Sequence, residues 1–347
     1  MIKYIDAIRL AQLNLLKKNK KNLVIGIEVI YNRLNFKKKY PKQVFEMPVS
    51  ELALSGFAVG IASQGYRPIV YHGRVEFAML AFDQIFTQAS KWNAMFGGNY
   101  PCPVTFKILV GRKYGDGPQH TANYHSIFLQ SSGLNVFIPS TPQEACDKMI
   151  SSNGSDYPSV ILEHRRLAFT SQTVNFKNKI INYKAQVYGN KKDILLLTYG
   201  DGIIDCLKAK TELKKYNINI TVISLSHFCF NKKMNKNLIK ELNKYKNIIL
   251  FESSSFEFGL LNSIIGQFKL LYNFNIANII NISPENTPCP SSWILSEKYY
   301  PSYIDIIKNI LKLKKNNNYQ NLKRSFEFTH SFPDLDFDKY NVDKQIF

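Results

Sequence analysis

The segment Phe45-Glu46-Met47-Pro48-Val49-Ser50-Glu51 places a carboxyl group at the start of an apolar helix. Pro48 and Ser50 are typical of the approach to a helix and of its N-cap, and residues 52–64 are mostly apolar. A helix this apolar is buried on most sides, so Glu51 should lie at the edge of a core. An acid in the first helical turn can simply complement the helix dipole. The rest of the chain decides between that interpretation and a chemical role for Glu51.

A loop of unusual composition, Gly111-Arg112-Lys113-Tyr114-Gly115-Asp116-Gly117-Pro118-Gln119-His120, follows a strand expected over residues 104–110. Its glycines and its proline cannot continue a strand or a helix, so the loop must have a shape of its own. Ligands of open α/β sheets bind at the carboxyl ends of the strands, which is where this loop lies. Histidine can act as an acid or stabilise charge, which makes His120 a second candidate catalytic residue.

Strands alternate with helices through the first half of the chain. Apolar residues at helical spacing predict an amphipathic first helix, and short apolar runs bounded by turn residues predict strands. This alternation implies parallel βαβ units and therefore a doubly wound α/β domain. The expected strands are 22–26, 68–72, 104–110, 134–139 and 159–163, and the expected helices are 3–18, 52–64, 76–96 and 142–152.

The alternation breaks at residues 164–192, a basic and polar stretch in which Gly189-Asn190 is the clear turn signal, so we expect a linker there. A second α/β set follows and closes with a helix at 302–313. From residue 314 onward the chain is polar and aperiodic, which predicts a tail that is disordered or extended on a partner. The expected strands of the second set are 193–199, 218–225, 247–252 and 275–282.

Length and composition limit the classes of protein to consider. The 347 residues suffice for two ordinary domains, and no apolar run is long enough to span a bilayer. The first residues predict a helix and not a secretory signal, so we expect a cytoplasmic protein with no membrane partner. The net charge of +19 comes from lysines mixed with asparagines, and without a nucleic-acid-binding motif we expect no nucleic-acid partner. The five cysteines are scattered and predict neither disulfides nor a zinc site.

Six segments, in order and at near-constant spacing, resemble one family. They look like the β subunit of thiamine-diphosphate-dependent 2-oxo acid dehydrogenases of the pyruvate and branched-chain type, and are also similar to the C-terminal half of transketolase. The resemblance runs from residue 1 to 313 and leaves out the tail. The segments are Phe45 to Glu51, Gly65-Tyr66-Arg67-Pro68-Ile69-Val70, Ala81-Phe82-Asp83-Gln84-Ile85, Gly117-Pro118-Gln119-His120, Ser132-Gly133-Leu134-Asn135-Val136-Phe137-Ile138-Pro139-Ser140-Thr141-Pro142 and Leu162-Glu163-His164-Arg165-Arg166-Leu167.

The resemblance implies an architecture and an assembly. Residues 1–185 would form the pyrimidine-binding domain, residues 186–313 a smaller α/β transketolase C-terminal domain, and residues 314–347 a polar tail that is extended or partner-bound. The chain would join an α subunit in an α2β2 heterotetramer and share thiamine diphosphate with it. The α subunit would hold Mg²⁺ and the diphosphate, so no metal is assigned to this chain. A dehydrogenase would also need a lipoyl acyltransferase as a partner.

The resemblance assigns roles to four residues. Glu51 falls on the glutamate that hydrogen-bonds ring nitrogen N1′ of the aminopyrimidine, and Phe77 falls on the aromatic residue that stacks on that ring. Val49 falls on an apolar wall residue of the cofactor site. His120 falls on the active-site histidine.

Other residues imitate the family pattern or depart from it. Tyr199-Gly200-Asp201-Gly202 imitates a diphosphate-and-magnesium motif, but it follows the first strand of the second set, so we interpret it as a strand-to-helix turn. Ile27 replaces a second acid of the family, and Gln130 replaces a histidine, and both changes bear on substrate and rate. His72 and His125 are interpreted as structural.

The leading hypothesis is the β component of a heteromeric thiamine-diphosphate enzyme that cleaves a 2-oxo acid or a ketose beside its carbonyl. The acyl or ketol fragment would pass to lipoamide in a dehydrogenase, or to a sugar or aldehyde in a transketolase-like transferase. Asp116-Gly117-Pro118 and Glu163-His164-Arg165-Arg166 favour the second acceptor. The alternative is a non-catalytic scaffold subunit that retains the transketolase-like fold, and Ile27 and Gln130 are its support.

Overall fold

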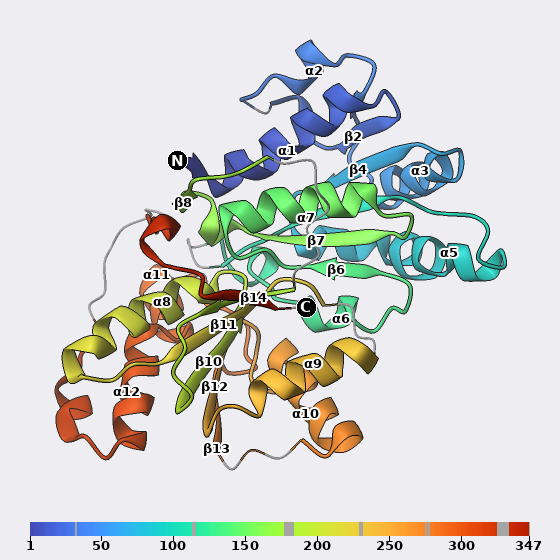
Figure 1. Ribbon diagram of the computed structural model, residues 1–347. Helices are drawn as coiled ribbons and strands as arrows, with labels where there is room; N and C mark the ends of the chain where they lie inside the picture. The colour runs from blue at the N-terminus through green and yellow to red at the C-terminus, as the bar shows by residue number, and fades with distance from the viewer. Residues whose placement is uncertain are drawn as a thin grey trace.

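Two six-stranded sheets and a short two-stranded one form the framework of the protein (Figure 1). The computed structural model describes residues 1–31, 33–112, 116–176, 184–228, 232–274, 276, 278–324 and 333–346. Within these ranges, no helix combines the length and the apolar character that crossing a bilayer requires.

The first sheet is wholly parallel, with the strand order β3-β2-β4-β5-β7-β6. The carboxyl ends of its strands therefore share one edge. Five of the six strands match the strands expected from the sequence; β3 lies where no strand was expected. The strands are β2 (Asn22–Gly26), β3 (Val44–Glu46), β4 (Arg67–His72), β5 (Thr105–Val110), β6 (Asn135–Phe137) and β7 (Ser159–His164).

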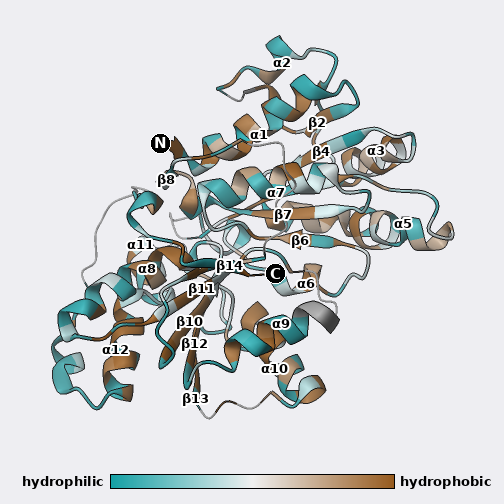
Figure 2. Ribbon diagram, viewed as in Figure 1, coloured by the Kyte–Doolittle hydropathy of each residue, from teal (hydrophilic) through white to brown (hydrophobic). Residues whose placement is uncertain are grey.

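Helices cover both faces of this sheet. Successive strand residues point to opposite faces, so Ile69 joins the apolar cluster under α1 and α7, while Val70 joins the cluster under α3. Figure 2 shows the brown, apolar strands between helices whose outer surfaces are teal. The covering helices are α1 (Tyr4–Lys18) and α7 (Pro142–Gly154) on one face, and α3 (Glu51–Ser63) on the other.

The long helix expected at 76–96 is a helical run whose geometry changes along its length. It contains a seven-residue π-helical stretch, a feature that often accompanies functional sites. The parts are α4 (Val75–Ala78), the 3-10 turn η2 (Met79–Ala81), the π-helix η3 (Asp83–Ala89) and α5 (Ser90–Met95). α3 packs along η2 and η3, which fixes the start of α3 against the carboxyl edge of the sheet.

The second sheet has the order β13-β12-β10-β11-β9-β14, with four parallel strands and two antiparallel strands at one edge. A pyrimidine-binding-type parallel domain followed by a smaller α/β domain is the fold class expected from the sequence, and it is confirmed. The strands are β9 (Ala185–Tyr188), β10 (Ile194–Tyr199), β11 (Thr221–Leu225), β12 (Asn247–Phe251), β13 (Asn278–Ile282) and β14 (Lys344–Ile346). The helices are α8 (Gly202–Leu213), α9 (Lys232–Leu242), α10 (Leu260–Tyr272), α11 (Trp293–Tyr299) and α12 (Tyr303–Leu313).

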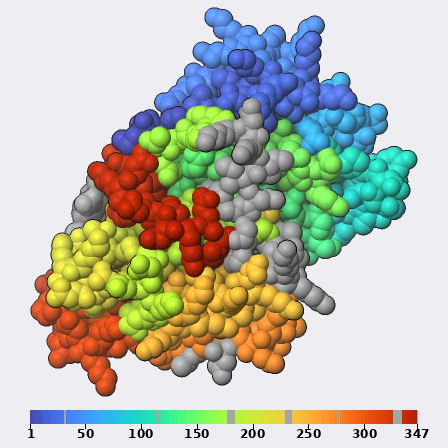
Figure 3. Space-filling model, viewed as in Figure 1, coloured from blue at the N-terminus to red at the C-terminus, as the bar shows by residue number. Residues whose placement is uncertain are grey.

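The expected linker at 164–192 and the expected tail contribute structure of their own. β8 (Ser171–Gln172) pairs with β1 (Ile2–Lys3), and β9 opens the second sheet. In the tail, β14 pairs with β9, and the backbone N–H of Ser171 donates to the carbonyl of Leu335 at 2.8 Å. Residues 333–346 therefore lie on this same chain, and Figure 3 shows the red C-terminal segment laid across the molecule. The domain bounds stay a prediction.

Candidate functional site

Glu51 begins α3 directly after the loop that follows β3. The backbone N–H of Ala53 donates to the hydroxyl of Ser50 at 3.4 Å, so Ser50 is the N-cap that the sequence predicts. Only 8% of Glu51 is exposed. Among the residues that the structure describes, its carboxyl group has no hydrogen-bond or ion-pair partner. A nearly buried carboxyl group without a protein partner has its oxygens available to a ligand.

Phe77 and His120 meet at the same edge of the sheet. Phe77 lies in α4, which follows β4, and His120 closes the 3-10 turn η4 (Pro118–His120), which follows β5. Their ring centroids are 5.6 Å apart and their planes are inclined by 85°, an edge-to-face contact. Phe77 remains 40% exposed, so the ring can still stack on a planar ligand.

The loop that carries His120 is held from two sides. The carboxylate of Asp116 forms ion pairs with Arg165 at 2.5 Å and with Arg74 at 3.5 Å, so it joins segments that follow β7 and β4. A Cβ atom on Gly111 would lie 2.0 Å from the carbonyl oxygen of His120, so glycine is required for the loop to fold back on its own start. The glycine at position 111 is thus explained by the path of the loop.

Glu76 is a site residue that the sequence interpretation missed. One oxygen of its carboxyl group accepts a hydrogen bond from the backbone N–H of Ala122 at 2.6 Å, and the other is buried with no hydrogen-bond partner among the described residues. Burial raises the pKa of Glu76, and the nearby charges of His120 and Arg74 oppose that rise. Glu76 therefore ties α4 to the His120 loop. The available signal was an acid directly before Phe77.

Val49 lies in the loop between β3 and α3 and is 80% exposed. Its neighbour Leu52 is 48% exposed, and Leu80 of η2 is 64% exposed. Exposed apolar residues that stand together mark a surface for a ligand or for another chain. The site is therefore open on the side where Val49 stands.

A buried polar network behind the His120 loop joins the two domains. Asp201 accepts hydrogen bonds from Arg112 and from Nδ1 of His164, each at 3.0 Å, and Nε2 of His164 lies 2.8 Å from Nε2 of His125. Burial alone would raise the pKa of Asp201, but the charges of Arg112 and His164 hold it well below its usual value. Burial also lowers the pKa of His125. His125 is thus a structural part of the network, as the sequence interpretation has it.

The segment that imitates a diphosphate motif lies between β10 and α8, which is the predicted strand-to-helix turn. Gly200 has φ +54°, and a Cβ atom there would lie 2.7 Å from the imidazole of His164. The Asp201 carboxylate already holds Arg112 and His164. The described residues include no group of three or more His, Cys, Asp or Glu side chains that could hold a metal ion.

Ile27 places an apolar side chain in the turn after β2, where the family usually has an acid. Ile27 packs against the apolar cluster on the α3 face of the sheet. Next to it, Glu28 has φ +60°, and its backbone N–H donates to the Glu46 carboxylate at 2.5 Å. The backbone N–H of Ile30 donates to the same carboxylate at 3.2 Å. Glu46 thus caps this turn, and the position that the family usually gives to an acid is apolar. Gln130 is exposed beside α6 (His125–Phe128).

These residues fit the pyrimidine half of a thiamine-type site. Glu51, Phe77 and His120 follow β3, β4 and β5 of one parallel sheet, at its carboxyl edge. Glu51 offers a carboxyl group without a protein partner, and Phe77 offers an exposed aromatic surface.

Comparisons with known proteins agree with the order of the two domains. Residues 1–170 match the family described as "Transketolase, pyrimidine binding domain", and residues 183–292 match "Transketolase, C-terminal domain". Pyruvate dehydrogenase E1 component subunit beta of Staphylococcus epidermidis is 34% identical over 230 residues, which are 64% of this chain and 71% of that protein. Acetoin:2,6-dichlorophenolindophenol oxidoreductase subunit beta of Cupriavidus necator is 27% identical over 279 residues, 80% of this chain and 82% of that protein.

Among solved structures, the chain is similar to one titled "Split gene transketolase, inactive beta4 tetramer". The TM-score is 0.73 with 18% sequence identity, and the match covers 90% of this chain and 97% of that one. This likeness supports the arrangement of both domains in a single fold.

Proposed function

The chain belongs to the family of pyruvate dehydrogenase E1 component β subunits, and from this premise we propose that it is the β component of a heteromeric thiamine-diphosphate enzyme. The observation that carries the proposal is the partnerless, nearly buried Glu51 at the same sheet edge as the Phe77–His120 pair. A cofactor's aminopyrimidine would give that carboxyl group its partner.

The proposed reaction is cleavage of the bond beside the carbonyl of a 2-oxo acid or a related ketone. The two relatives support this class, because one is named for pyruvate, a 2-oxo acid, and the other for acetoin, a hydroxyketone. The fragment would pass to lipoamide in a dehydrogenase complex or to an aldehyde or sugar in a transketolase-like transfer. The proposal therefore limits the donor substrate to a 2-oxo acid or a related ketone, whereas the acceptor can be lipoamide, an aldehyde or a sugar.

Each candidate residue has a distinct task in this proposal. Thiamine diphosphate, when bound, supplies the nucleophilic carbon for the cleavage. Glu51 holds and moves a proton at ring nitrogen N1′, Phe77 stacks on the aminopyrimidine, and Val49 bounds it from the loop before α3. His120 stands against the edge of Phe77, where it can donate a proton to the substrate or stabilise its charge. Glu76 positions the loop that carries His120.

An α subunit would complete the site in an α2β2 assembly. Support comes from the exposed apolar side chains around the site, since large exposed apolar patches mark interfaces. The α subunit would hold Mg²⁺ and the diphosphate, and a lipoyl acyltransferase would be the next partner if lipoamide is the acceptor. The exposed apolar residues of this region are Phe45, Val49, Leu52, Phe57, Phe77 and Leu80.

The test is calorimetric titration of thiamine diphosphate and Mg²⁺ into this chain, alone and mixed with the α subunit from the same genome. We expect tight binding in the mixture alone, and a Glu51→Gln chain that assembles normally but turns over 2-oxo acids about two to four orders of magnitude more slowly. Glu285→Gln, an exposed acid of the second domain, is the matched control and should behave as the unmodified chain.

A well-formed α–β complex that binds no cofactor would contradict the proposal. It would favour the scaffold alternative, in which the fold serves assembly. Turnover that Glu51→Gln leaves undiminished would contradict the role of Glu51 while leaving the family assignment in place.

A further inference from the structure

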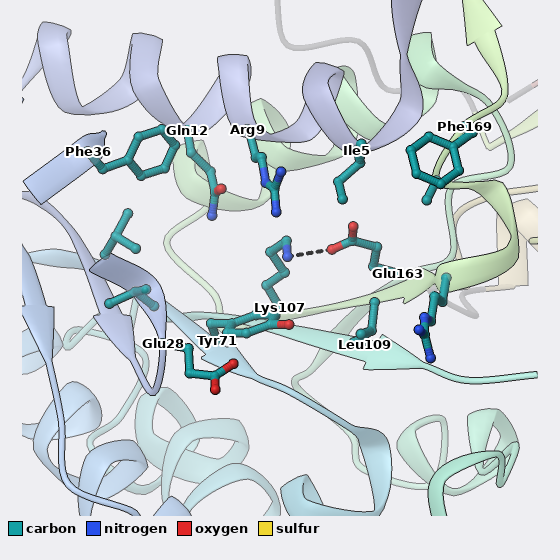
Figure 4. Close-up of a pocket in the computed structure, with 14 residues that line it drawn as sticks. Ile5, Arg9, Gln12, Glu28, Phe36, Tyr71, Lys107, Leu109, Glu163 and Phe169 are labelled. Carbon is teal, nitrogen blue, oxygen red and sulfur yellow. Dashed lines mark ion pairs between the residues drawn. The ribbon is translucent and has the colours of Figure 1, made fainter. Parts of the chain in front are cut away.

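A cavity of about 440 Å³ lies on the other face of the first sheet, between α1 and the strands β2, β4, β5 and β7 (Figure 4). The alternation of strand residues separates it from the candidate site. His72 faces the α3 side, where it is 3.1 Å from the hydroxyl of Ser55, whereas Tyr71 lines the cavity on the α1 side. Glu51, Phe77 and His120 are not among its lining residues. This cavity is therefore independent of the proposed function.

The floor of the cavity is a buried ion pair on two adjacent strands. The ammonium group of Lys107 on β5 pairs with the carboxylate of Glu163 on β7, and both residues are less than a tenth exposed. The same ammonium lies 4.4 Å from the centre of the Tyr71 ring. The pair neutralises itself, so the floor carries no net charge of its own.

The roof is formed by two polar side chains of α1. In Figure 4, Arg9 and Gln12 point from the helix down towards Lys107. Neither has a hydrogen-bond or ion-pair partner among the residues that the structure describes. Gln12 is only 4% exposed and lines the cavity, so its amide is available to a ligand there. The guanidinium of Arg9, which has no ion-pair partner among the described residues, faces the neutralised Lys107–Glu163 pair across the space, and its charge favours an anion beside it.

The two other charged groups of the lining, Arg165 and Glu28, leave this charge balance unchanged. Arg165 is held by Asp116 at 2.5 Å, outside the roof and floor described above. Glu28 lies beyond the ring of Tyr71 in Figure 4, on the side away from Arg9. The space between roof and floor thus has one excess positive charge, with hydrogen-bond donors on both sides.

We propose that this cavity binds a small organic carboxylate with an apolar body. Arg9 and Gln12 would hold the carboxylate, because a guanidinium matches a carboxylate with two parallel hydrogen bonds. The volume falls within the range of small-molecule sites. The remainder of the lining is mostly apolar and would cover the rest of the molecule. The larger apolar lining residues are Ile5, Val24, Val29, Phe36, Leu109 and Phe169.

The experiment is calorimetric titration of hexanoate and benzoate into the full chain, with hexan-1-ol, benzamide and inorganic phosphate as comparison probes. We expect both carboxylates to bind and the neutral probes to bind much more weakly. Arg9→Gln should weaken carboxylate binding by at least about tenfold, as expected when a charge-assisted hydrogen bond is lost, and Gln12→Leu should weaken it too. Lys17→Gln, which removes an exposed charge from the same helix, should change affinity less than about twofold.

Each other outcome overturns the inference. Absence of carboxylate binding to the unmodified chain would rule out the site, as would binding that Arg9→Gln leaves unchanged. Binding of phosphate without binding of the carboxylates would mean that the apolar walls play no part and that the ligand class is wrong. Circular dichroism and thermal unfolding of the variants identify any loss of binding caused by misfolding. The α subunit and thiamine diphosphate are absent from these titrations, so failure here leaves the proposed function untouched.

Discussion

The imidazole of His120 meets the ring of Phe77 edge to face, with their centroids 5.6 Å apart, although the two residues follow different strands. The contact depends on the fold of the loop that begins at Gly111, where a Cβ atom would strike the His120 carbonyl. It also depends on Glu76, which binds the backbone just past His120. The stacking surface and the histidine are therefore positioned as a unit.

Replacing Phe77 with alanine should weaken thiamine diphosphate binding to the α–β complex by about tenfold, because an aromatic contact of this type contributes about 0.5–1.5 kcal/mol beyond area burial. The same change should raise the KM for the 2-oxo acid, since His120 loses its neighbour. Calorimetry and steady-state kinetics give the two values. Phe96→Ala removes an aromatic ring that is 46% exposed and lies outside the site, and should leave cofactor affinity unchanged. Equal effects of the two changes would argue against a stacking role for Phe77.

Glu51→Gln should lower kcat by about two to four orders of magnitude, the range typical of positioned acid–base groups. The fold should be unaffected, because in the described part of the chain the Glu51 carboxyl group forms no bond that glutamine would lose. The measurement is single-turnover kinetics of the assembled complex, with circular dichroism as the check on folding. A loss of kcat accompanied by a loss of helix would mean that Glu51 acts on the structure of α3 instead.

Asp201→Asn should lower the free energy of unfolding by about 3–5 kcal/mol, because Arg112 would be left as an uncompensated buried charge between the domains. Asp193→Asn is the matched control. Asp193 pairs with Lys314 at the surface, with about two-fifths of each side chain exposed, so that change should cost at most about 1 kcal/mol. Urea unfolding measures both. Similar costs for the two changes would show that the interdomain network adds no stability beyond that of a surface pair.

The pattern of apolar residues was sufficient to predict the parallel sheet, because its strands are buried on both faces and read as continuous apolar runs. The same pattern did not predict several strands at or near the edges of the sheets. β8 and β9 lie in the stretch 164–192 expected to be a linker, since their pairing depends on partners far away in the sequence: β1 for β8 and β14 for β9. Edge strands of this kind carry little local signal.

The residues of the candidate site show the same contrast between local patterns, which the sequence reveals, and long-range contacts, which it does not. Glu51 and His120 were predicted as site residues from motifs that carry their own turn and capping residues, and that prediction still has to be tested. Glu76 was missed because its role comes from a hydrogen bond to Ala122, which only the folded loop brings near. The partners of Asp201 were missed for a similar reason, since Arg112 and His164 belong to the other domain.

Stability should fall as the pH falls from about 6.5 to about 4, in part because of His72. Burial lowers the pKa of His72 to about 4, whereas an unfolded histidine titrates near 6.5. Between these values the unfolded state binds more protons than the folded state, so acid favours unfolding, by up to about 3 kcal/mol for this group. His72→Gln should reduce the slope of unfolding free energy against pH in that window. Ser55→Ala, which leaves His72 buried, should keep the slope. If Ser55→Ala also lost the pH dependence of the unfolding free energy, the cause would be the Ser55–His72 hydrogen bond and not the burial of His72.

Phe337→Ala should lower the free energy of unfolding by about 3–5 kcal/mol, the usual cost of truncating a buried aromatic residue. Phe337 is 1% exposed and packs into the same apolar cluster as α1 and α8, so the tail contributes to this chain's own core. Phe258→Ala is the control, because Phe258 is 66% exposed and its loss should stay within about 0.5 kcal/mol. Urea unfolding of the isolated chain and of the α–β complex shows whether residues 333–346 stabilise this chain itself or its contact with the partner. A cost that appears in the complex alone would mean that residues 333–346 dock on the partner, whereas an equal cost in both would mean that they close the edge of β9 within one chain.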